Sequence, residues 1–472
     1  MSDRVWDLKE LLFQLDEMNP KYKQIYQTIR SLIEKAELKA NTKLPSIRQL
    51  ADLLQVSRNT TLTAYEQLLA EGYIRSEPKR GYFVEEYEPM HLQCPKAMPV
   101  KSQGTELPAF VDFRAGTVDM TAFPIKAWRQ CSNEVLREEI AYTYGNVQGD
   151  PHLRANLAHY LLQSRGIRTS PDAIIVGSST QQLLMHLTIL LKKDCSAIAV
   201  ENPGYDGART IFSLQGFTIQ PIDITAKGIS VKQLEQTDSR VVYITPSHQF
   251  PTGVTMPVAE RQQLLKWARQ NNGYIIEDDY DSEFRYKQQP IPALSSIGNP
   301  ERVIYLSTFS KAFLPSIRLS YMILPPSLLV RYQQLFSSVE QTASSLHQRT
   351  MALFMERGYW DSHIRKMRAN YKRKMQRLVS ALEGSFGETV KIIGFQSGLY
   401  ILIQIQSSIS EENLISQAAK NGVKVYPTSQ YYLGKESQKT ILQLGFSNLS
   451  MEEIDEGVRL LHEAWSKSIN EL

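Results

Sequence analysis

Residues 44–84 read LPSIRQLADLLQVSRNTTLTAYEQLLAEGYIRSEPKRGYFV, and this stretch decides the fold of the N-terminal part of the chain. Ser46 followed by Gln49 is a capping-box pattern, which predicts the start of an amphipathic helix. Ser57 is a suitable N-cap for a second helix, which Gly72 ends. Two short helices joined by the four residues LQVS predict a helix-turn-helix.

The flanking segments complete a small domain. Upstream, apolar residues at helical spacing predict a further helix, and they are Ile25, Ile29, Leu32, Ile33 and Ala36. Downstream, residues 73–76 and 82–84 are expected to form the two strands of a hairpin whose tip, EPKRG, is basic. A hairpin in this place is predicted to serve as a wing beside the DNA-reading helix.

The second helix of the pair begins with SRNTT, where a recognition helix places the side chains that contact base edges. Arg58 suits a guanine edge and Asn59 an adenine edge. We expect the hydroxyl groups of Thr60 and Thr61 to reach phosphates. At the wing tip, Lys79 and Arg80 are placed to follow the DNA backbone or to enter the minor groove.

The charge of this segment favours nucleic acid as its partner. Residues 21–84 carry eleven Lys and Arg against six Asp and Glu, a net +5, whereas the whole chain of 472 residues carries +4. For any single residue, a solvated face of a helical bundle explains the charge equally well. The ordered set of helices, donors and basic hairpin favours binding of double-stranded DNA.

Residues of about 86–110 change in character, and their Pro, Ser and Gly content predicts an extended linker. From Val111 onward, short apolar runs alternate with helical stretches, and these runs lie at 173–176, 197–200, 241–244, 274–277 and 303–306. Continuous β-branched runs between helices predict an α/β fold around a buried, mostly parallel sheet. The pattern changes from about residue 390, which indicates a smaller C-terminal α+β lobe.

Composition narrows the class of protein. Apolar residues make up 42% and charged residues 22% of the chain, as in globular proteins. The cysteines Cys94, Cys131 and Cys195 are far apart, so we expect no disulfide framework and no zinc site, and a cytoplasmic location fits. The N-terminus lacks the apolar core of a signal peptide, and no apolar run is long enough to span a bilayer.

The whole stretch from residue 44 to residue 84 resembles the winged-helix domain of the GntR superfamily. By that resemblance Arg48, at the start of the first helix of the pair, is also expected to contact phosphate. From about Val111 to the C-terminus the chain resembles fold-type-I aminotransferases, and the combination is typical of MocR/GabR-type regulators.

The second resemblance implies pyridoxal 5'-phosphate as cofactor. Such proteins need a lysine that forms a Schiff base with the cofactor aldehyde. The stretch STFSK matches the family's S-x-x-K turn and identifies Lys311 for this catalytic role. Arg318, seven residues later, matches the arginine that holds the cofactor phosphate.

Further cofactor contacts follow from the same resemblance. The run EDDY assigns Asp278 to the ring nitrogen, whose proton a carboxylate retains, and Tyr280 to the phenolic oxygen. Tyr205, in the P-x-Y pattern, is expected to stack on the ring. In the turn GSSTQQ, Thr180 and Gln181 match the pair that cradles the phosphate at a helix start. We expect Thr308 to add a hydroxyl group there.

Two departures from aminotransferases affect the expected activity. Phe250, in SHQFPTG, stands where those enzymes carry an asparagine for the phenolic oxygen, a role left open to His248 or Gln249. Gln443 stands where they place the arginine for the substrate carboxylate, and Gln430 stands where the γ-aminobutyrate regulator of the family has its own. Arg209 is an open substitute.

Three hypotheses follow, of which the first is favoured. In the first, the body senses an amino acid, an amine or a PLP-related effector through its aminotransferase-like domain while the head controls transcription. In the second, the chain is an active aminotransferase with an accessory head. In the third, the body no longer binds cofactor and serves only for dimerisation. The first leaves a partial transamination half-reaction open. We expect residues 1–85 (core about 20–84) to bind DNA, 86–110 to link, and 111–472 to bind effector, in a homodimer that reads two half-sites.

Overall fold

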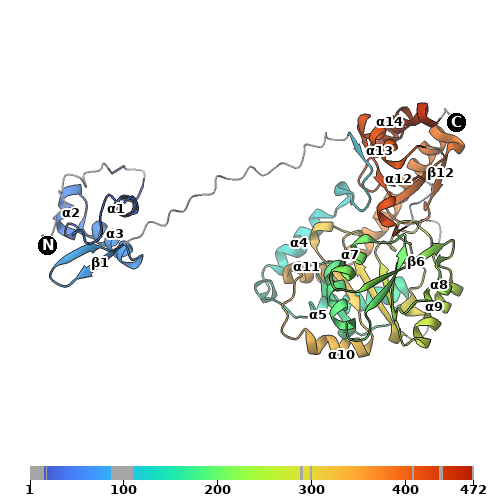
Figure 1. Ribbon diagram of the computed structural model, residues 1–472, viewed down its shortest axis with the longest axis horizontal. Helices are drawn as coiled ribbons and strands as arrows, with labels where there is room; N and C mark the ends of the chain where they lie inside the picture. Colours follow the sequence, from blue (N-terminus) through green and yellow to red (C-terminus); the bar gives the residue numbers. More distant parts are fainter. Residues whose placement is uncertain are drawn as a thin grey trace. The chain divides into compact units, whose positions relative to one another are not determined.

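The computed structural model describes residues 15–16, 19–86, 110–286, 291–297, 300–406, 409–434 and 440–469. The chain divides into two compact units, one within residues 1–105 and the other within residues 106–472. We call the first unit the head and the second the body (Figure 1). The predicted linker lies, apart from its ends, outside the described residues.

The described part of the head consists of a helical unit with one β-hairpin. Its elements are α1 (Lys21–Glu34), α2 (Ile47–Leu54), α3 (Arg58–Ala70), β1 (Ile74–Glu77) and β2 (Gly81–Val84). Strands β1 and β2 pair antiparallel, with Glu77 opposite Gly81. The order and bounds of these elements confirm the predicted winged helix-turn-helix.

Local hydrogen bonds explain where the two helices of the motif begin. The Ser46 Oγ atom accepts from the Gln49 N–H at 3.2 Å, and the Gln49 Oε1 atom accepts from the Ser46 N–H at 2.9 Å. Both halves of the predicted capping box are therefore present. At α3, the Ser57 Oγ atom accepts from the Thr60 N–H at 3.1 Å.

The body is built on a large sheet. In the described residues its eight strands have the order β4-β11-β10-β9-β8-β5-β6-β7. They are β4 (Ile174–Gly177), β5 (Ala197–Asn202), β6 (Thr218–Thr225), β7 (Gly228–Ile229), β8 (Val241–Ile244), β9 (Tyr274–Asp279), β10 (Val303–Thr308) and β11 (Ser320–Ile323). Pairing is parallel from β10 through β6, whereas β11 and β7 run antiparallel to their neighbours. The predicted α/β class with a mostly parallel sheet is confirmed.

Both faces of the sheet are covered, which explains its continuous apolar strands. Ile275 and Ile276 are neighbours in β9, yet they enter different cores because side chains alternate along a strand. The Ile276 face packs against α6 (Thr180–Leu191), α7 (Asp206–Leu214) and α10 (Pro326–Leu335). The other face packs against α4 (Ile125–Val135), α5 (Pro151–Arg165), α8 (Val231–Leu234), α9 (Val258–Gln270) and α11 (Ser345–Glu356).

A second, antiparallel sheet forms the C-terminal part of the body, which we call the small lobe. Its strands are β12 (Val390–Ile393), β13 (Tyr400–Ile405), β16 (Ile441–Gly445) and β15 (Tyr426–Pro427), in that order. With them lie α12 (Tyr359–Phe386), α13 (Glu411–Lys420) and α14 (Met451–Ile469), as Figure 1 shows. The predicted α+β lobe is thus present.

The chain enters the body through a strand that is tied to the small lobe. Strand β3 (Val111–Asp112) pairs in parallel with β14 (Val423–Lys424). Short 3-10 turns connect other elements, and they are η2 (Met120–Ala122), η3 (Glu139–Tyr142), η4 (Pro171–Ala173), η5 (Leu294–Ser296), η6 (Pro300–Arg302), η7 (Pro315–Ile317), η8 (Gly387–Thr389) and η9 (Ser429–Tyr431).

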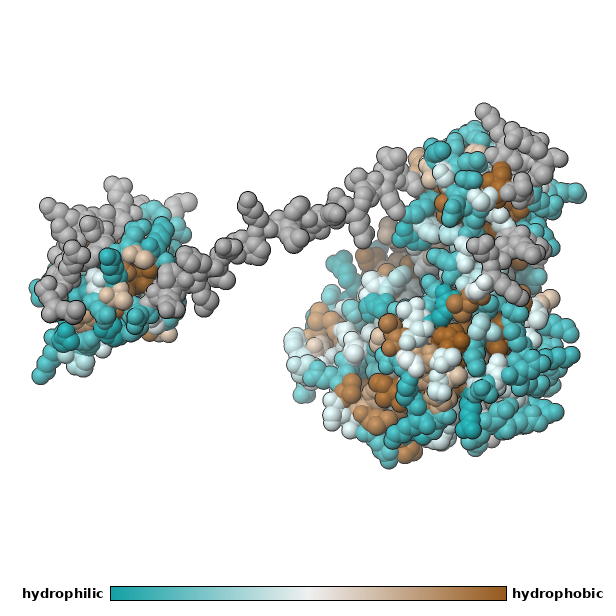
Figure 2. Space-filling view, viewed as in Figure 1, coloured by the Kyte–Doolittle hydropathy of each residue, from teal (hydrophilic) through white to brown (hydrophobic). Residues whose placement is uncertain are grey.

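The surface of the described residues is mainly hydrophilic, with hydrophobic residues gathered in patches on the face of the body that Figure 2 shows. No helix in the described segments combines the length and the apolar character that a bilayer span requires.

Candidate functional site

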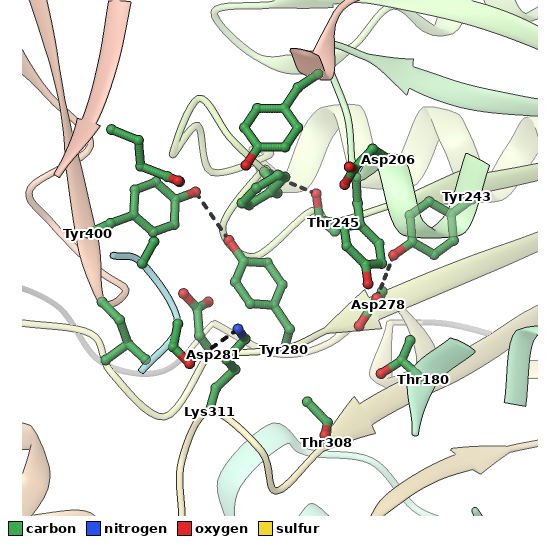
Figure 3. A pocket seen from close by; sticks show the side chains of 17 residues that line it. Thr180, Asp206, Tyr243, Thr245, Asp278, Tyr280, Asp281, Thr308, Lys311 and Tyr400 are labelled. Atoms are coloured by element: carbon green, nitrogen blue, oxygen red, sulfur yellow. Dashed lines mark hydrogen bonds between the residues drawn. The ribbon is translucent and has the colours of Figure 1, made fainter. Parts of the chain in front are cut away.

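The residues that follow the carboxyl ends of several parallel strands line a cavity of about 260 Å³ (Figure 3). This edge of an open α/β sheet is where ligands usually bind. The cavity brings together six of the residues predicted for the cofactor: Thr180, Tyr205, Asp278, Tyr280, Thr308 and Lys311. Gln181 and Arg318 lie outside its lining.

Lys311 follows β10 and points into the cavity (Figure 3). Its Nζ atom donates to the Gly116 carbonyl at 3.4 Å. Burial lowers the pKa of the Lys311 amine, and the carboxylates of Asp281 and Asp278 oppose this effect. A lowered pKa raises the fraction of neutral amine, which is the nucleophilic form.

Gly116 comes from a remote part of the chain and adopts a backbone conformation that favours glycine. Its φ of +81° lies in the left-handed region, and a Cβ atom there would lie 2.1 Å from the Lys311 Nζ atom. A side chain at this position would strain the backbone and displace the Lys311 amine from its observed place.

Asp278, in β9, is 4% exposed and presents a carboxylate to the cavity. One oxygen, Oδ2, accepts from the Tyr243 hydroxyl, and the other, Oδ1, has no partner among the described residues. Burial, together with the neighbouring Asp279 and Asp281 carboxylates, raises the pKa of Asp278 to about 7, although the hydrogen bond from Tyr243 opposes the shift. A protonated ring nitrogen would supply the missing donor.

The two predicted tyrosines lie in the same cavity. The Tyr280 hydroxyl donates to the His248 carbonyl at 3.1 Å and lies 3.4 Å from the Tyr400 hydroxyl. Burial, with the Asp278 and Asp206 carboxylates, raises the pKa of the Tyr205 phenol to about 12. Burial also raises the pKa of the Tyr280 phenol, so both phenols are neutral at physiological pH.

The predicted phosphate contacts converge on one end of the sheet. Thr180 begins α6, whose first-turn N–H groups have no carbonyl partner within the helix. Thr308 ends β10 and accepts a hydrogen bond from the Ser310 N–H at 3.1 Å. Gln181 is exposed on the first turn of α6, and Arg318 is exposed two residues before β11. In the described residues, no hydrogen bond or ion pair engages the Arg318 guanidinium.

Two neighbours of Phe250, His248 and Gln249, were candidates for the missing asparagine's role, and the structure places them differently. Gln249 is 1% exposed, and both ends of its amide are used: Nε2 donates to the Pro203 carbonyl of the loop after β5 at 2.9 Å, and Oε1 accepts from the Thr252 N–H of its own loop at 3.1 Å. His248 contacts the Tyr280 hydroxyl through its Nδ1 atom at 3.1 Å, and that atom lies 2.8 Å from the Asp281 Oδ2 atom. His248 therefore acts on the cavity through Tyr280, while Gln249 does not reach it.

The three positions considered for binding a substrate carboxylate lie in different surroundings. Gln443, in β16, lines the cavity and is 2% exposed. Gln430 is exposed outside the lining. Arg209 donates to the backbone carbonyls of Gln430 at 3.2 Å and Tyr431 at 3.4 Å, so its guanidinium holds a loop.

Several lining residues were not identified from the sequence. Tyr243, the partner of Asp278, sits in the apolar run VVYI, where a tyrosine signals a hydrogen-bond partner inside the core. Asp281 and Asp206 each follow a predicted site residue by one position, and that adjacency was the available signal. The sequence around Gly116 gave no signal that this residue lines the cavity.

On the head, most predicted DNA contacts are exposed. Arg58 and Asn59 are exposed on the first turn of α3, and the Arg48 side chain is 74% exposed. Lys79 is exposed at the hairpin tip with a φ of +62°. Arg80 is also exposed and pairs with Glu77 at 2.6 Å.

The expectation that Thr61 reaches phosphate is wrong. Thr61 is 0% exposed and faces the core of the head together with Ala64, Tyr65 and Leu68. Helix α3 buries this face because positions i, i+3, i+4 and i+7 share one side of a helix. Thr60 is half-buried, and its hydroxyl lies 2.8 Å from the Ser57 hydroxyl.

Comparison with known proteins agrees with both units. Residues 21–84 match the family model of bacterial regulatory proteins, gntR family, and residues 110–461 match that of aminotransferase class I and II. The fold of the body is similar to that of Pyrococcus horikoshii kynurenine aminotransferase, solved in complex with PMP. The TM-score is 0.68 at 27% identity, over 76% of this chain and 91% of that one.

Relatives that match almost the whole chain include two proteins named as regulators. The protein named "Uncharacterized HTH-type transcriptional regulator YdeL" of Bacillus subtilis (strain 168) is 40% identical over 450 residues, which cover 94% of this chain and 97% of that protein. The "Probable rhizopine catabolism regulatory protein MocR" of Rhizobium meliloti is 30% identical over 472 residues, which cover 96% of each. The chain therefore belongs to the MocR-type family, in which a gntR-family helix-turn-helix head precedes an aminotransferase class I and II body.

Proposed function

We propose that this chain is a transcription regulator whose head binds an operator in double-stranded DNA and whose body senses an amine or amino acid through pyridoxal 5'-phosphate. One observation carries the proposal. The chain that exposes Arg58 and Asn59 at the start of a recognition helix also encloses Lys311 and Asp278 in one cavity.

The residues of the cavity fit the cofactor. The buried Asp278 Oδ1 atom lacks a donor, which a protonated ring nitrogen supplies. Lys311 would hold the aldehyde carbon, and the other predicted contacts would be Tyr280, Tyr205, Thr180, Gln181, Thr308 and Arg318. When bound, pyridoxal phosphate supplies an aldehyde for amines and a ring that withdraws electrons.

The protein's own side chains would orient the cofactor and set the protonation state of its atoms. Tyr280 and Tyr205 are neutral phenols, so Tyr280 can donate to the phenolic oxygen and Tyr205 can stack on the ring without adding charge. The Asp278 carboxylate would retain a proton on the ring nitrogen. Burial lowers the pKa of the Lys311 amine, so its neutral form can accept the proton that a bound amine loses.

The proposal includes an arrangement for the whole chain. Residues 1–85 bind DNA, 86–110 link, and 111–472 bind the effector, in a homodimer that contacts two half-sites. A cytoplasmic location follows from a chromosomal operator as the partner. These boundaries agree with two compact units that separate near residue 105.

An active aminotransferase with an accessory head is the second candidate, because Lys311 and Asp278 share the cavity that the reaction needs. Gln443 weighs against it. Transamination needs the Cα–H bond of the substrate held perpendicular to the cofactor ring, and a neutral amide grips a carboxylate less firmly than a guanidinium does. A partial half-reaction remains compatible with a sensor.

The Lys311→Ala variant tests the proposal. The purified protein is expected to be yellow, and borohydride reduction should fix the pyridoxyl group to Lys311, as mass spectrometry of peptides will reveal. Lys311→Ala should lose the visible band and the effect of amines on operator binding. The control Lys193→Ala alters an exposed lysine and should keep both.

The same samples separate a regulator from an enzyme. A panel of amino acids and amines should shift the band and change operator affinity, with negligible turnover of keto acids. Multiple turnovers at roughly 1 s⁻¹ or faster, without a ligand effect on DNA binding, would favour the enzyme. An unchanged spectrum in Lys311→Ala would remove the lysine assignment.

A further inference from the structure

A buried arginine outside the cavity lining is bonded to the segments that carry site residues. Arg165 is the last residue of α5 and is 4% exposed. Its guanidinium is always charged, and burying a charge is costly unless partners compensate it. The partners of Arg165 therefore indicate what the residue does for the site.

The first partner is a carboxylate. The Arg165 Nε atom lies 2.7 Å from the Asp279 Oδ2 atom, in an ion pair whose side chains are 4% and 1% exposed. The contact acts through charge, because the Nε–H group makes no aligned hydrogen bond. Among the described residues, no other cation forms an ion pair with Asp279.

Asp279 is the neighbour of Asp278 in β9. Side chains alternate along a strand, so Asp278 lines the cavity while Asp279 does not (Figure 3). In β10, the Tyr305 hydroxyl donates to Asp279 Oδ2 at 2.6 Å and the Ser307 hydroxyl donates to the Asp279 carbonyl at 2.8 Å. After burial, the Asp279 carboxylate is a further cause of the raised pKa of Asp278. Arg165 thus compensates the charge that lies next to Asp278.

The other donors of Arg165 hold two loops. One terminal nitrogen donates to the Ser247 Oγ atom at 2.7 Å, and the other donates to the Ile291 carbonyl at 2.6 Å. Ser247 precedes His248, whose carbonyl accepts from the Tyr280 hydroxyl at 3.1 Å. One guanidinium therefore connects the end of β9 to the loop that holds Tyr280.

A second buried arginine on the same helix shows what a purely structural role requires. Arg154 is 7% exposed in α5, and it donates to the backbone carbonyls of Gly149 at 3.2 Å and Pro171 at 2.9 Å. These partners lie outside the cavity lining. Arg165 differs from Arg154 because its partners are a carboxylate and a hydroxyl next to site residues.

Other charges near Arg165 come in equal numbers of each sign. Two acids and two cations act on it electrostatically, and they are Glu277, Glu283, Arg261 and Arg285. On the cavity side, the charges that act on Asp278 are those of Asp279, Asp281 and Lys311. Removal of the Arg165 charge would therefore leave the Asp279 carboxylate uncompensated beside Asp278.

We propose that Arg165 is a positioning residue for the pyridoxal phosphate site, which fixes Asp278 through Asp279 and Tyr280 through Ser247. This inference rests on the proposed function, because it takes the cavity to hold that cofactor. Arg165 lies outside the cavity lining, so its replacement should change how the site binds without removing a contact to the cofactor.

Arg165→Gln tests the charge in the full-length protein. Cofactor affinity, measured by equilibrium dialysis, should fall about tenfold. The midpoint of the pH titration of the visible band should rise by about one unit. An Asp278 that is harder to ionise retains the ring-nitrogen proton less firmly, so the ring withdraws electrons less strongly and the Schiff-base nitrogen keeps its proton to higher pH.

Three further variants separate the contributions. Arg165→Lys restores the charge and should restore the midpoint, but one nitrogen cannot replace the fork of donors, so part of the affinity loss should remain. Ser247→Ala cuts only the bond to the loop and should lose about threefold to tenfold in cofactor affinity. Arg154→Lys is the matched control and should keep the parental affinity and midpoint.

The inference fails if Arg165 only stabilises the fold. In that case Arg165→Gln would lower the unfolding temperature and leave the cofactor affinity and the midpoint as in the parent. Parental affinity in Ser247→Ala would also overturn the inference, and this variant decides if Arg165→Gln does not fold. A yellow parent with unaffected variants leaves the sensor proposal standing and removes only the positioning role. A parent without the visible band would overturn both.

Discussion

Asp278 illustrates how a single buried group prepares the site. Its carboxylate is held by one hydroxyl, from Tyr243, and carries a second oxygen without a partner. The two nearby acids raise its pKa further. The residue is therefore expensive to ionise until a positively charged N–H donor arrives, which couples cofactor binding to the protonation of this carboxyl group.

A pH dependence of stability follows from this coupling. The pKa of Asp278 is raised in the folded state from 3.8 to about 7, so the folded chain holds a proton that the unfolded chain releases. The stabilisation is present below about pH 4 and is lost as the pH rises through about 7. In the cofactor-free protein, the unfolding midpoint of the body should fall more steeply over this window than in Asp278→Asn.

Adding cofactor should flatten the parent's profile, because a protonated ring nitrogen favours the carboxylate. Glu201 and Glu283 have pKa values raised to about 7 as well, so Asp278→Asn should keep part of the dependence. Calorimetric scans at several pH values measure it. Identical profiles for parent and variant, with and without cofactor, would show that Asp278 is not the coupled group.

At the scale of the element, helix α3 carries both the fold of the head and its reading of DNA. Its inner side packs Thr61, Ala64 and Tyr65 into the core, and its first turn exposes Arg58 and Asn59. The Ser57 cap fixes the start of the helix, so it also fixes the direction in which those two side chains leave it.

Substitutions in the head should separate base reading from backbone binding. Arg58→Ala should lose about 1–3 kcal/mol of operator affinity and relax the preference at one base pair. Lys79→Ala should weaken binding to all sequences and reduce the salt slope by about one. Fluorescence anisotropy over a salt series measures both. Arg137→Ala, on the body, is the control, and parental binding by Arg58→Ala would refute the recognition-helix assignment.

Local sequence signals predicted these helices, whereas contacts between residues far apart in the sequence were not predicted. The helices of the head begin where Ser46 and Ser57 indicate, because capping is decided within four residues. Thr61 was misplaced because adjacent positions at a helix start differ by 100° in direction, which a polar sequence such as NTT does not resolve. Gly116 reaches Lys311 across 195 residues, a contact that only the folded chain creates.

At the scale of the whole molecule, the segment that enters the body leads directly to the cavity that contains Lys311. Val111 and Asp112 form β3, and Gly116, four residues further, accepts the hydrogen bond from Lys311. Displacement of the Lys311 amine would therefore break a hydrogen bond to the segment that enters the body. Occupation of the cavity is thus connected, through this hydrogen bond, to the segment by which the chain enters the body.

If the body is a dimer, a change in the cavity could alter how two heads bind DNA together. The body exposes large apolar side chains, among them Met120 at 86% and Tyr144 at 79%, which a second copy would cover. The chain between Glu86 and Phe110 can span at most about 80–86 Å, from about 3.3–3.6 Å per residue. Two heads on one dimer would bind two half-sites, the second of them at high effective concentration.

Light scattering at micromolar concentration should therefore give the mass of two chains, and an operator with two intact half-sites should bind about 10²–10⁴-fold more tightly than one with a scrambled half-site. The scrambled operator keeps its length and composition, so any difference reports the second head. Changing the half-site spacing by half a helical turn should cost affinity only as far as the linkers resist the rotation. A stable monomer, or equal affinity for both operators, would contradict the dimer, because a single head cannot gain from a second half-site.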